Sequence, residues 1–255
     1  MEHWVISNGQ VGKYDTDNRP LYIYQRMRTK GHQIPHISEH LELVNYAHNI
    51  LFGAPTPLTA EQINKDCATL LKRGGYAESS THIVELRYDG CQNYSLRVLE
   101  TSLYKHFAVR AVRPNAHLFS ISNLEIHLPT SVAITANELL CNMARRYDCD
   151  IPICIDECGM VTSIDGASPI IVRGKDIIIS TTIESVELNM VIETLSKLSK
   201  YDLHIAPISI EEATNADELL YVDYRGVTAV KSLSEQYYSD NIAHTIIAAL
   251  NFTIR

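Results

Sequence analysis

The stretch from Leu21 to Leu51, LYIYQRMRTKGHQIPHISEHLELVNYAHNIL, decides the fold of the first part of the chain. Residues 21–28 interleave aromatic and apolar residues with polar ones, and this period of two predicts a β-strand. From Ser38 onward the apolar residues recur at helical spacing, and Ser38 with Glu39 predicts the N-terminal cap of that helix. The stretch therefore predicts a strand, a turn and a helix.

The residues that follow predict a second helix and more sheet. The segment 54–57 (APTP) interrupts the chain, Thr59 opens a helix, and Gly74 and Gly75 end it. Three strand-like runs come next, at residues 82–88, 94–99 and 106–112. The first hundred residues are thus expected to form a sheet and two helices.

The rest of the chain again mixes helices and strands. It predicts helices over residues 131–147, 184–200 and 236–250. Strands are predicted at residues 151–156, 160–163, 170–182 with a turn at 173–176, 204–208, 219–222 and 227–230. The irregular segment 113–129 is the best candidate linker. We therefore expect an α/β (α+β) fold with two domains, residues 1–120 and 121–255.

The composition restricts the partners of the chain. Its 255 residues include 22 Lys and Arg against 30 Asp and Glu, a formal net charge of −8. This balance disfavours binding to nucleic acid or to an anionic membrane. No apolar run approaches the length that spans a bilayer, and the N-terminus does not read as a signal peptide. We expect a cytoplasmic protein whose six cysteines are free thiols.

Three groups of short motifs follow one another along the chain. The first is YQRMR at residues 24–28 with SEHLEL at 38–43, and the second is ARR at 144–146 with IDECGMV at 155–161. The third is ISI at 208–210, NADELL at 215–220 and GVTAV at 226–230. In this order they resemble the class IV aminotransferases, the fold-type IV pyridoxal-phosphate enzymes that include branched-chain and D-amino acid aminotransferases and aminodeoxychorismate lyase. The resemblance implies their two-domain fold and a homodimer.

The resemblance also locates the position of the lysine that anchors the cofactor in this family. That position falls at Pro129 or Thr130, and no lysine occurs between Lys105 and Lys175. A lysine amine is needed to hold pyridoxal phosphate as a Schiff base and to shuttle the proton. The chain therefore lacks the covalent anchor at the place where the family has it.

The same resemblance implies that the residues for three further cofactor functions are also absent. The glutamate beside the pyridine nitrogen corresponds to Ser163, and the phosphate-holding arginine corresponds to Leu43. The helix start that binds the phosphate is matched by Val186, Glu187 and Leu188, where the Glu187 carboxylate would repel an anion. The resemblance therefore extends to the scaffold but not to the cofactor site.

We accordingly expect no cofactor and no catalytic residue, and interpret the chain as a non-catalytic binding or structural homodimer. The alternative is an active aminotransferase or aminodeoxychorismate lyase that uses an unrecognised lysine, Lys105 or Lys175. An unrelated chemistry in the inherited cleft is a third interpretation, although the sequence contains no recognisable pair of nucleophile and base.

Arginines in the predicted strands suggest a small carboxylate as ligand. Arg28 matches a family position near the substrate entrance, and a guanidinium can bind a carboxylate through two hydrogen bonds. Tyr24 and Arg97 are the other candidates to line the cleft. The competing interpretation of such strand arginines is a solvated face or a salt bridge with Glu85 or Glu100.

Two clusters of potential metal ligands do not predict a metal site. They are Cys149, Cys154 and Cys158, and His32, His36 and His40. The cysteine spacing is not that of a zinc knuckle, and alternation along a strand directs neighbouring side chains to opposite faces. Pro35 interrupts any helix that would stack the three imidazoles. We expect no bound metal.

Overall fold

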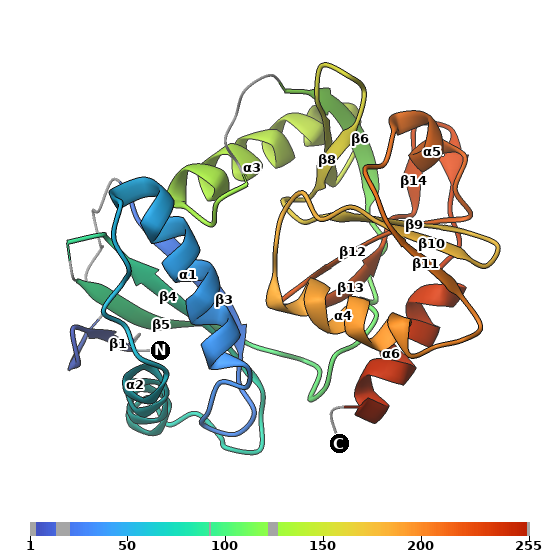
Figure 1. Ribbon diagram of the computed structural model, residues 1–255. Helices are drawn as coiled ribbons and strands as arrows, with labels where there is room; N and C mark the ends of the chain where they lie inside the picture. Colours follow the sequence, from blue (N-terminus) through green and yellow to red (C-terminus); the bar gives the residue numbers. More distant parts are fainter. Residues whose placement is uncertain (1–3, 14–20, 92, 122–126, 254–255) are drawn as a thin grey trace. The chain divides into compact units, whose positions relative to one another are not determined.

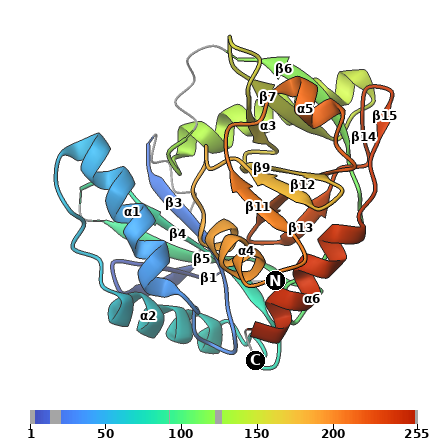
Figure 2. The ribbon, with the colours of Figure 1, turned by 45° about the vertical axis from the view of Figure 1, so that its right-hand side comes forward.

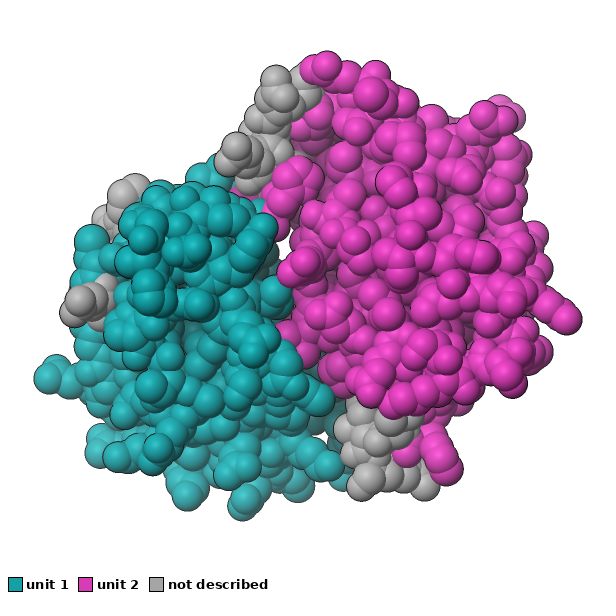
Figure 3. All heavy atoms as spheres, viewed as in Figure 1, with its two compact units in different colours: residues 1–106, 128–132 teal, residues 107–127, 133–255 magenta. Residues whose placement is uncertain are grey.

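The computed structural model describes residues 4–13, 21–91, 93–121 and 127–253. The chain divides into two compact units, residues 1–106 with 128–132 (unit 1) and residues 107–127 with 133–255 (unit 2; Figure 3). The sequence places a domain boundary between residues 120 and 121, whereas the compact units change over between 106 and 107. Residues 128–132 then return to unit 1.

Unit 1 is an antiparallel sheet with two helices. Its strands are β1 (Trp4–Ser7), β2 (Gln10–Lys13), β3 (Ile23–Arg28), β4 (His82–Tyr88) and β5 (Tyr94–Thr101). They are arranged in the order β2-β1-β5-β4-β3. The predicted strands at 21–28, 82–88 and 94–99 are confirmed, whereas β1 and β2 were not predicted.

The helices of unit 1 are α1 (Ile37–Phe52) and α2 (Ala60–Arg73), and both contribute to one core with the apolar side chains of the sheet (Figure 1). Thr59 caps α2 through Gln62 N–H, and Gly74 ends it, as predicted. The predicted cap of α1 at Ser38 is wrong. That helix begins at Ile37 because His36 adopts the left-handed conformation, φ 55°, and buried Ile37 belongs to the core.

Unit 2 contains two sheets. The first has the order β11-β10-β9-β12-β13, with β9 (Pro169–Arg173), β10 (Asp176–Ile179), β11 (Asp202–Ile205), β12 (Glu218–Asp223) and β13 (Gly226–Ala229). The second has the order β15-β14-β6-β7-β8, with β6 (Asn115–Ser120), β7 (Ile151–Ile155), β8 (Val161–Ile164), β14 (Ser232–Leu233) and β15 (Gln236–Tyr237). The mixed α+β class is therefore confirmed.

The β9–β12 pair is buried on both faces. Alternate residues such as Ile170 and Val172 join a core with helices α4 (Val186–Ser196) and α6 (Asn241–Thr253), which lie side by side in Figures 1 and 2. Ile171 and Tyr221 face a second core, which they share with β7 and β8. Burial on both sides explains why these strands are continuously apolar.

The remaining helices of unit 2 are α3 (Ser131–Ala144), followed by a 3-10 turn over Arg145–Tyr147, and the short α5 (Ile210–Thr214). Ser209 and Glu212 form a capping box at the start of α5. None of the helices in the described ranges is both long and apolar enough to cross a bilayer.

Two sequence predictions around the middle of the chain are wrong. Residues 106–112 do not form a strand and make only an isolated bridge, Val109 to Val227. The segment 113–129, predicted as a linker, instead contains β6, which pairs in parallel with β7 and β14. Its pairing partners lie far along the sequence, so local pattern could not reveal them.

The closing helix also differs from the prediction. It begins at Asn241 and not at residue 236, because Gln236 and Tyr237 pair with β14 as strand β15. Glu218 then accepts hydrogen bonds from the N–H groups of Ile242 and Ala243 at the first turn of the helix. A buried carboxylate from β12 therefore fixes where α6 starts.

Candidate functional site

Pro129 and Thr130, where the resemblance locates the family's lysine, lie against the edge strand β3 of unit 1. The carbonyl oxygen of Pro129 accepts a hydrogen bond from Tyr24 N–H at 2.8 Å, and Thr130 forms a bridge with Ile23. Ser131 N–H donates to the carbonyl oxygen of Tyr22 at 2.8 Å. The structure thus brings two predicted site positions together, Tyr24 and Pro129–Thr130, through their backbones. The Thr130 side chain is buried.

The residues that the resemblance assigns to the other three cofactor functions take part in the packing and capping of the fold. Leu43 is half-buried on α1, and Ser163 is buried on β8 opposite Cys154. At the start of α4, the hydroxyl of Ser185 accepts a hydrogen bond from Leu188 N–H at 3.0 Å. Glu187 is buried in the same first turn, where a carboxylate interacts favourably with the helix dipole.

Lysines are confined to the surface of the described chain. Every described lysine side chain is exposed: Lys30, Lys65, Lys72, Lys105, Lys175, Lys197, Lys200 and Lys231. Lys105 follows β5, and Lys175 lies in the turn between β9 and β10. Neither of the two lysines considered as an alternative anchor is therefore in a desolvated environment.

A buried carboxylate organises the arginines on one face of the unit 1 sheet. Glu85 is 0% exposed and forms ion pairs with Arg26 Nε at 2.9 Å, Arg87 Nε at 2.7 Å and Arg97 Nη2 at 2.6 Å. The strand register explains why these side chains are close together, because Arg26 and Arg97 both lie directly opposite Glu85 on the neighbouring strands. We call these four residues the Glu85 cluster.

The Glu85 cluster sets the charge state of its own carboxylate. Burial raises the pKa of Glu85, but the positive charges of Arg97 and Arg26 outweigh burial and hold that pKa below its usual value. Glu85 is therefore ionised at neutral pH. Three guanidinium groups share one carboxylate, so the cluster carries a net charge of about +2.

The three predicted ligand contacts have different partners within unit 1. Arg97 belongs to the Glu85 cluster. Arg28 is buried and donates to the carbonyl oxygens of Tyr104 at 2.9 Å and His106 at 3.1 Å. Tyr24 lies on the same strand face, with the Arg26 guanidinium carbon 5.3 Å from its ring centroid. The side chains share a sheet face, and each also has a structural role.

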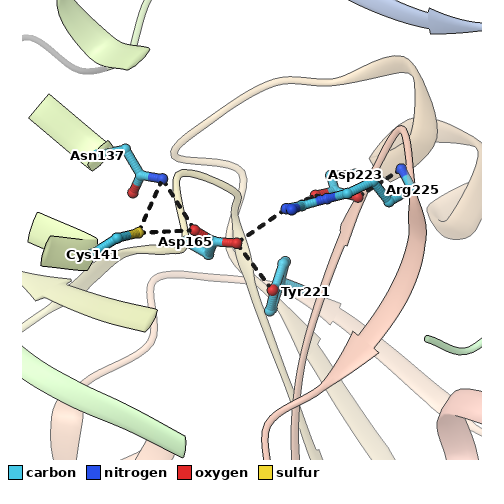
Figure 4. Close-up of polar contacts among 6 residues, drawn as sticks. All are labelled: Asn137, Cys141, Asp165, Tyr221, Asp223 and Arg225. Atoms are coloured by element: carbon cyan, nitrogen blue, oxygen red, sulfur yellow. Dashed lines mark hydrogen bonds and ion pairs between the residues drawn. The ribbon is translucent and has the colours of Figure 1, made fainter. Parts of the chain in front are cut away.

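A second polar network in unit 2 was not predicted (Figure 4). One carboxylate oxygen of Asp165 accepts hydrogen bonds from Asn137 Nδ2 at 3.0 Å and Cys141 Sγ at 3.6 Å. The other accepts from Tyr221 OH at 3.2 Å and Arg225 Nη2 at 3.0 Å. Asp165 therefore ties α3 to the β12–β13 hairpin.

The titratable groups around Asp165 are held in single charge states at neutral pH. Burial and the nearby Asp165 carboxylate raise the pKa of the Cys141 thiol to about 12. The same two causes raise the pKa of Tyr221 well above its usual value. The Cys141 thiol and the Tyr221 phenol therefore stay protonated at neutral pH, so neither is present as a thiolate or a phenolate.

The predicted histidine and cysteine clusters do not converge. His32 Nε2 lies 3.1 Å from the carbonyl oxygen of Tyr76. His36 Nδ1 lies 3.1 Å from Glu39 Oε1, and His40 Nδ1 lies 3.2 Å from Gln25 Oε1. All six cysteines are free. Within the described ranges, no group of three His, Cys, Asp or Glu side chains could hold a metal ion.

His40 makes the stability of unit 1 depend on pH. Burial is the main cause that lowers its pKa from 6.5 to about 4. The unfolded chain therefore binds a proton that the folded chain excludes between these pH values, and stability falls as pH drops from 6.5 to 4. We expect a loss of up to about 3 kcal/mol from this residue.

The pH effect is measured by urea unfolding monitored through the fluorescence of Trp4, the single tryptophan, which packs against the unit 1 core. The His40→Gln variant should lose distinctly less stability than the wild type between pH 6.5 and 4. Parallel pH profiles for the two proteins would contradict the assignment.

The fold has many solved relatives, although the sequence alone finds none. No protein-family model matches the sequence, and no curated protein matches it. The structure is similar to a branched-chain aminotransferase from Thermoproteus uzoniensis, with a TM-score of 0.82 and 16% identity over 98% of this chain and 94% of that chain. An aminotransferase from Brucella abortus bound to pyridoxal phosphate gives a TM-score of 0.81 and 15% identity over 100% and 99% of the two chains.

A fold IV transaminase from Curtobacterium pusillum is also similar, with a TM-score of 0.78 and 14% identity over 98% of both chains. Each comparison covers nearly the full length of both proteins, so the likeness includes both compact units. The chain therefore has the fold of the fold-type IV aminotransferases.

Proposed function

We propose that the chain uses the aminotransferase fold as a non-catalytic binding or structural homodimer that does not anchor pyridoxal phosphate. The observation that carries the proposal is the distribution of lysines. No lysine occurs between Lys105 and Lys175, and every described lysine side chain is exposed. An anchoring lysine needs a desolvated or electropositive site that lowers its pKa.

The residues at the other cofactor positions do not fit pyridoxal phosphate either. Leu43 offers no charge to a phosphate, and the carboxylate of Glu187 occupies the first turn of α4, where a phosphate would need positive potential. Ser163 is a neutral hydroxyl and cannot keep a pyridine nitrogen protonated as a carboxylate would. These substitutions act on separate parts of the cofactor, which supports loss of the whole site.

We infer that the ligand of the remaining site is a small carboxylate contacted by Arg28, Tyr24 and Arg97. Tyr24 and Arg28 lie on the same face of β3. Arg97 of β5 lies opposite Glu85 of β4 in the strand register, and its side chain is therefore on that same face of the sheet. The net positive charge of the Glu85 cluster favours an anion there. A rise in melting temperature with a small carboxylic acid, but not with its amide, tests the assignment. No rise with any acid at millimolar concentration would contradict it.

The absence of a cofactor anchor is tested by absorption spectroscopy with added pyridoxal phosphate. The folded chain should show no more visible aldimine absorption than the same chain unfolded in urea, because the unfolded chain presents the same lysines without a site. The proposal would be contradicted if the folded protein absorbed more strongly than the unfolded chain and if this extra absorption saturated at one equivalent of pyridoxal phosphate.

A further inference from the structure

Arg87 is a buried arginine whose hydrogen-bonding capacity the chain uses only in part. It lies on β4, between β3 and β5 in the unit 1 sheet, and is 9% exposed. Its Nε donates to Glu85 Oε1 at 2.7 Å, but neither of its two Nη nitrogens donates to any described residue. Neither nitrogen is among the unpaired polar atoms that are sealed from solvent. Four N–H donors at the end of this side chain are therefore open to water or to a ligand.

Two contacts hold the Arg87 guanidinium group in one orientation. Glu85 binds its Nε side, and the ring of Tyr22 lies close to it, with the Arg87 Cζ 4.4 Å from the ring centroid. The ion pair and the cation–π contact together restrict rotation of the group. Because Nη1 and Nη2 lie on the side of the guanidinium opposite Nε, they form a preorganised pair of donors. Such a pair matches the spacing of two oxygens of one oxyanion.

The residues around Arg87 favour an anion with two negative charges. Three guanidinium groups meet one carboxylate in the Glu85 cluster, so a dianion balances the charge of these four residues. Tyr24 and Ser95, directly opposite Arg87 on β3 and β5, carry hydroxyl groups and no formal charge. Burial is the main cause that raises the pKa of Tyr22, so its phenol also stays neutral beside Arg87. An anion bound at Arg87 is therefore next to a positive cluster and to neutral hydroxyl groups.

We propose that Arg87 binds the phosphoryl group of a small phosphomonoester through Nη1 and Nη2. A phosphomonoester carries about two negative charges and three acceptor oxygens on a single centre. Two of these oxygens match the Nη pair of Arg87, and the third is left for another donor. A monocarboxylate leaves one positive charge of the cluster unbalanced, and a dicarboxylate separates its two charges by a carbon chain.

This site goes beyond the carboxylate contacts proposed above, since Arg87 is not one of them and the resemblance assigns it no role. It is also separate from the question of the cofactor anchor, because a simple phosphomonoester has no aldehyde and forms no Schiff base. The two proposals can therefore fail independently. Binding of a carboxylate without binding of a phosphomonoester would overturn only the assignment of Arg87.

Isothermal titration calorimetry of the full chain with ethyl phosphate, ethyl sulfate and propionate tests the class of ligand. Ethyl phosphate and ethyl sulfate share a tetrahedral shape and three terminal oxygens, but at about pH 7.5 the phosphate is mainly a dianion and the sulfate a monoanion. Ethyl phosphate should bind about tenfold or more tightly than either of the other two. Equal affinities, or no binding of ethyl phosphate at millimolar concentration, would overturn the proposal.

Substitution of Arg87 tests the location of the site. Arg87→Gln should weaken binding of ethyl phosphate by at least about tenfold, because charged hydrogen bonds to the phosphoryl group are lost. Arg87→Lys keeps the charge without the paired donors and should also weaken binding, by a smaller factor. Arg73→Gln is the matched control, since it removes the same charge from an exposed residue at the end of α2.

Circular dichroism checks that each variant folds, and the comparison of the three probes on the wild type depends on none of them. The control variant should bind ethyl phosphate within about twofold of the wild type. If Arg87→Gln and Arg73→Gln bound ethyl phosphate equally well, the phosphomonoester would not be held by Arg87 and the proposal would be wrong.

Discussion

Replacing Glu85 by alanine is expected to lower the free energy of unfolding of unit 1 by about 3–5 kcal/mol. The carboxylate is fully buried and neutralises part of the charge of Arg26, Arg87 and Arg97. Without it, three guanidinium groups remain close together in a poorly solvated position, and their hydrogen bonds to the carboxylate are lost. Urea unfolding followed by Trp4 fluorescence measures the loss in the unit that contains the cluster.

Two further variants separate charge from general damage to the sheet. Glu100→Ala removes an exposed carboxylate from the same sheet, at the end of β5, and should change stability by no more than about 0.5 kcal/mol. Glu85→Gln keeps the shape and removes the charge, so its loss of stability should be larger at low salt, where the arginines repel one another more strongly. A salt-independent loss would show that the cluster acts through packing and not through charge.

Replacing Gly226 by alanine is expected to destabilise unit 2 by about 2–5 kcal/mol. Its φ is +131°, and an added Cβ would lie 2.3 Å from the carbonyl oxygen of Ala108. That oxygen accepts a hydrogen bond from Val227 N–H at 3.1 Å, so the clash falls on a contact between the β12–β13 hairpin and residues 107–112. The backbone there cannot move away without breaking this bond.

Gly174→Ala is the matched control for backbone conformation. Gly174 also has a positive φ, +58°, but an added Cβ would have no atom within 4 Å. Its substitution should cost only about 1–2 kcal/mol, the price of the left-handed conformation. Thermal unfolding followed by circular dichroism compares the two. Equal losses at the two positions would rule out the close approach to Ala108 as the cause.

Local signals made much of the fold predictable. The change of period between residues 21–28 and the following helix is confirmed by β3 and α1, and Thr59 with Gly74 marks both ends of α2. Turn residues around Gly174 separate β9 from β10 as predicted. In each case the residues that specify the structure lie within a few positions of it.

The errors arose where distant residues decide the structure. Strand β6 forms because β7 and β14 offer edges on both sides, and residues 236–237 are strand and not helix because β14 pairs with them. His36 precedes α1 in a left-handed backbone conformation, which is uncommon for a residue other than glycine and which the pattern of apolar residues does not reveal.

The candidate site was predictable only in part. Sequence reasoning considered Glu85 as one partner of the strand arginines, and strand register explains why it meets three of them at once. The network around Asp165 could not be foreseen, because Tyr221 and Arg225 follow it by 56 and 60 residues and no motif joins them. An arginine four residues after a buried tyrosine, at a hairpin tip, carries no distinctive signal.

The most direct test of the central claim is borohydride reduction of the protein after incubation with one equivalent of pyridoxal phosphate, followed by peptide mass mapping. Reduction fixes any Schiff base at the amine that formed it. If no lysine has an anchoring site, the label should stay well below one equivalent and be spread over exposed lysines, as in the urea-unfolded chain. One equivalent on a single lysine of the folded protein would contradict the account and identify an anchor for the cofactor.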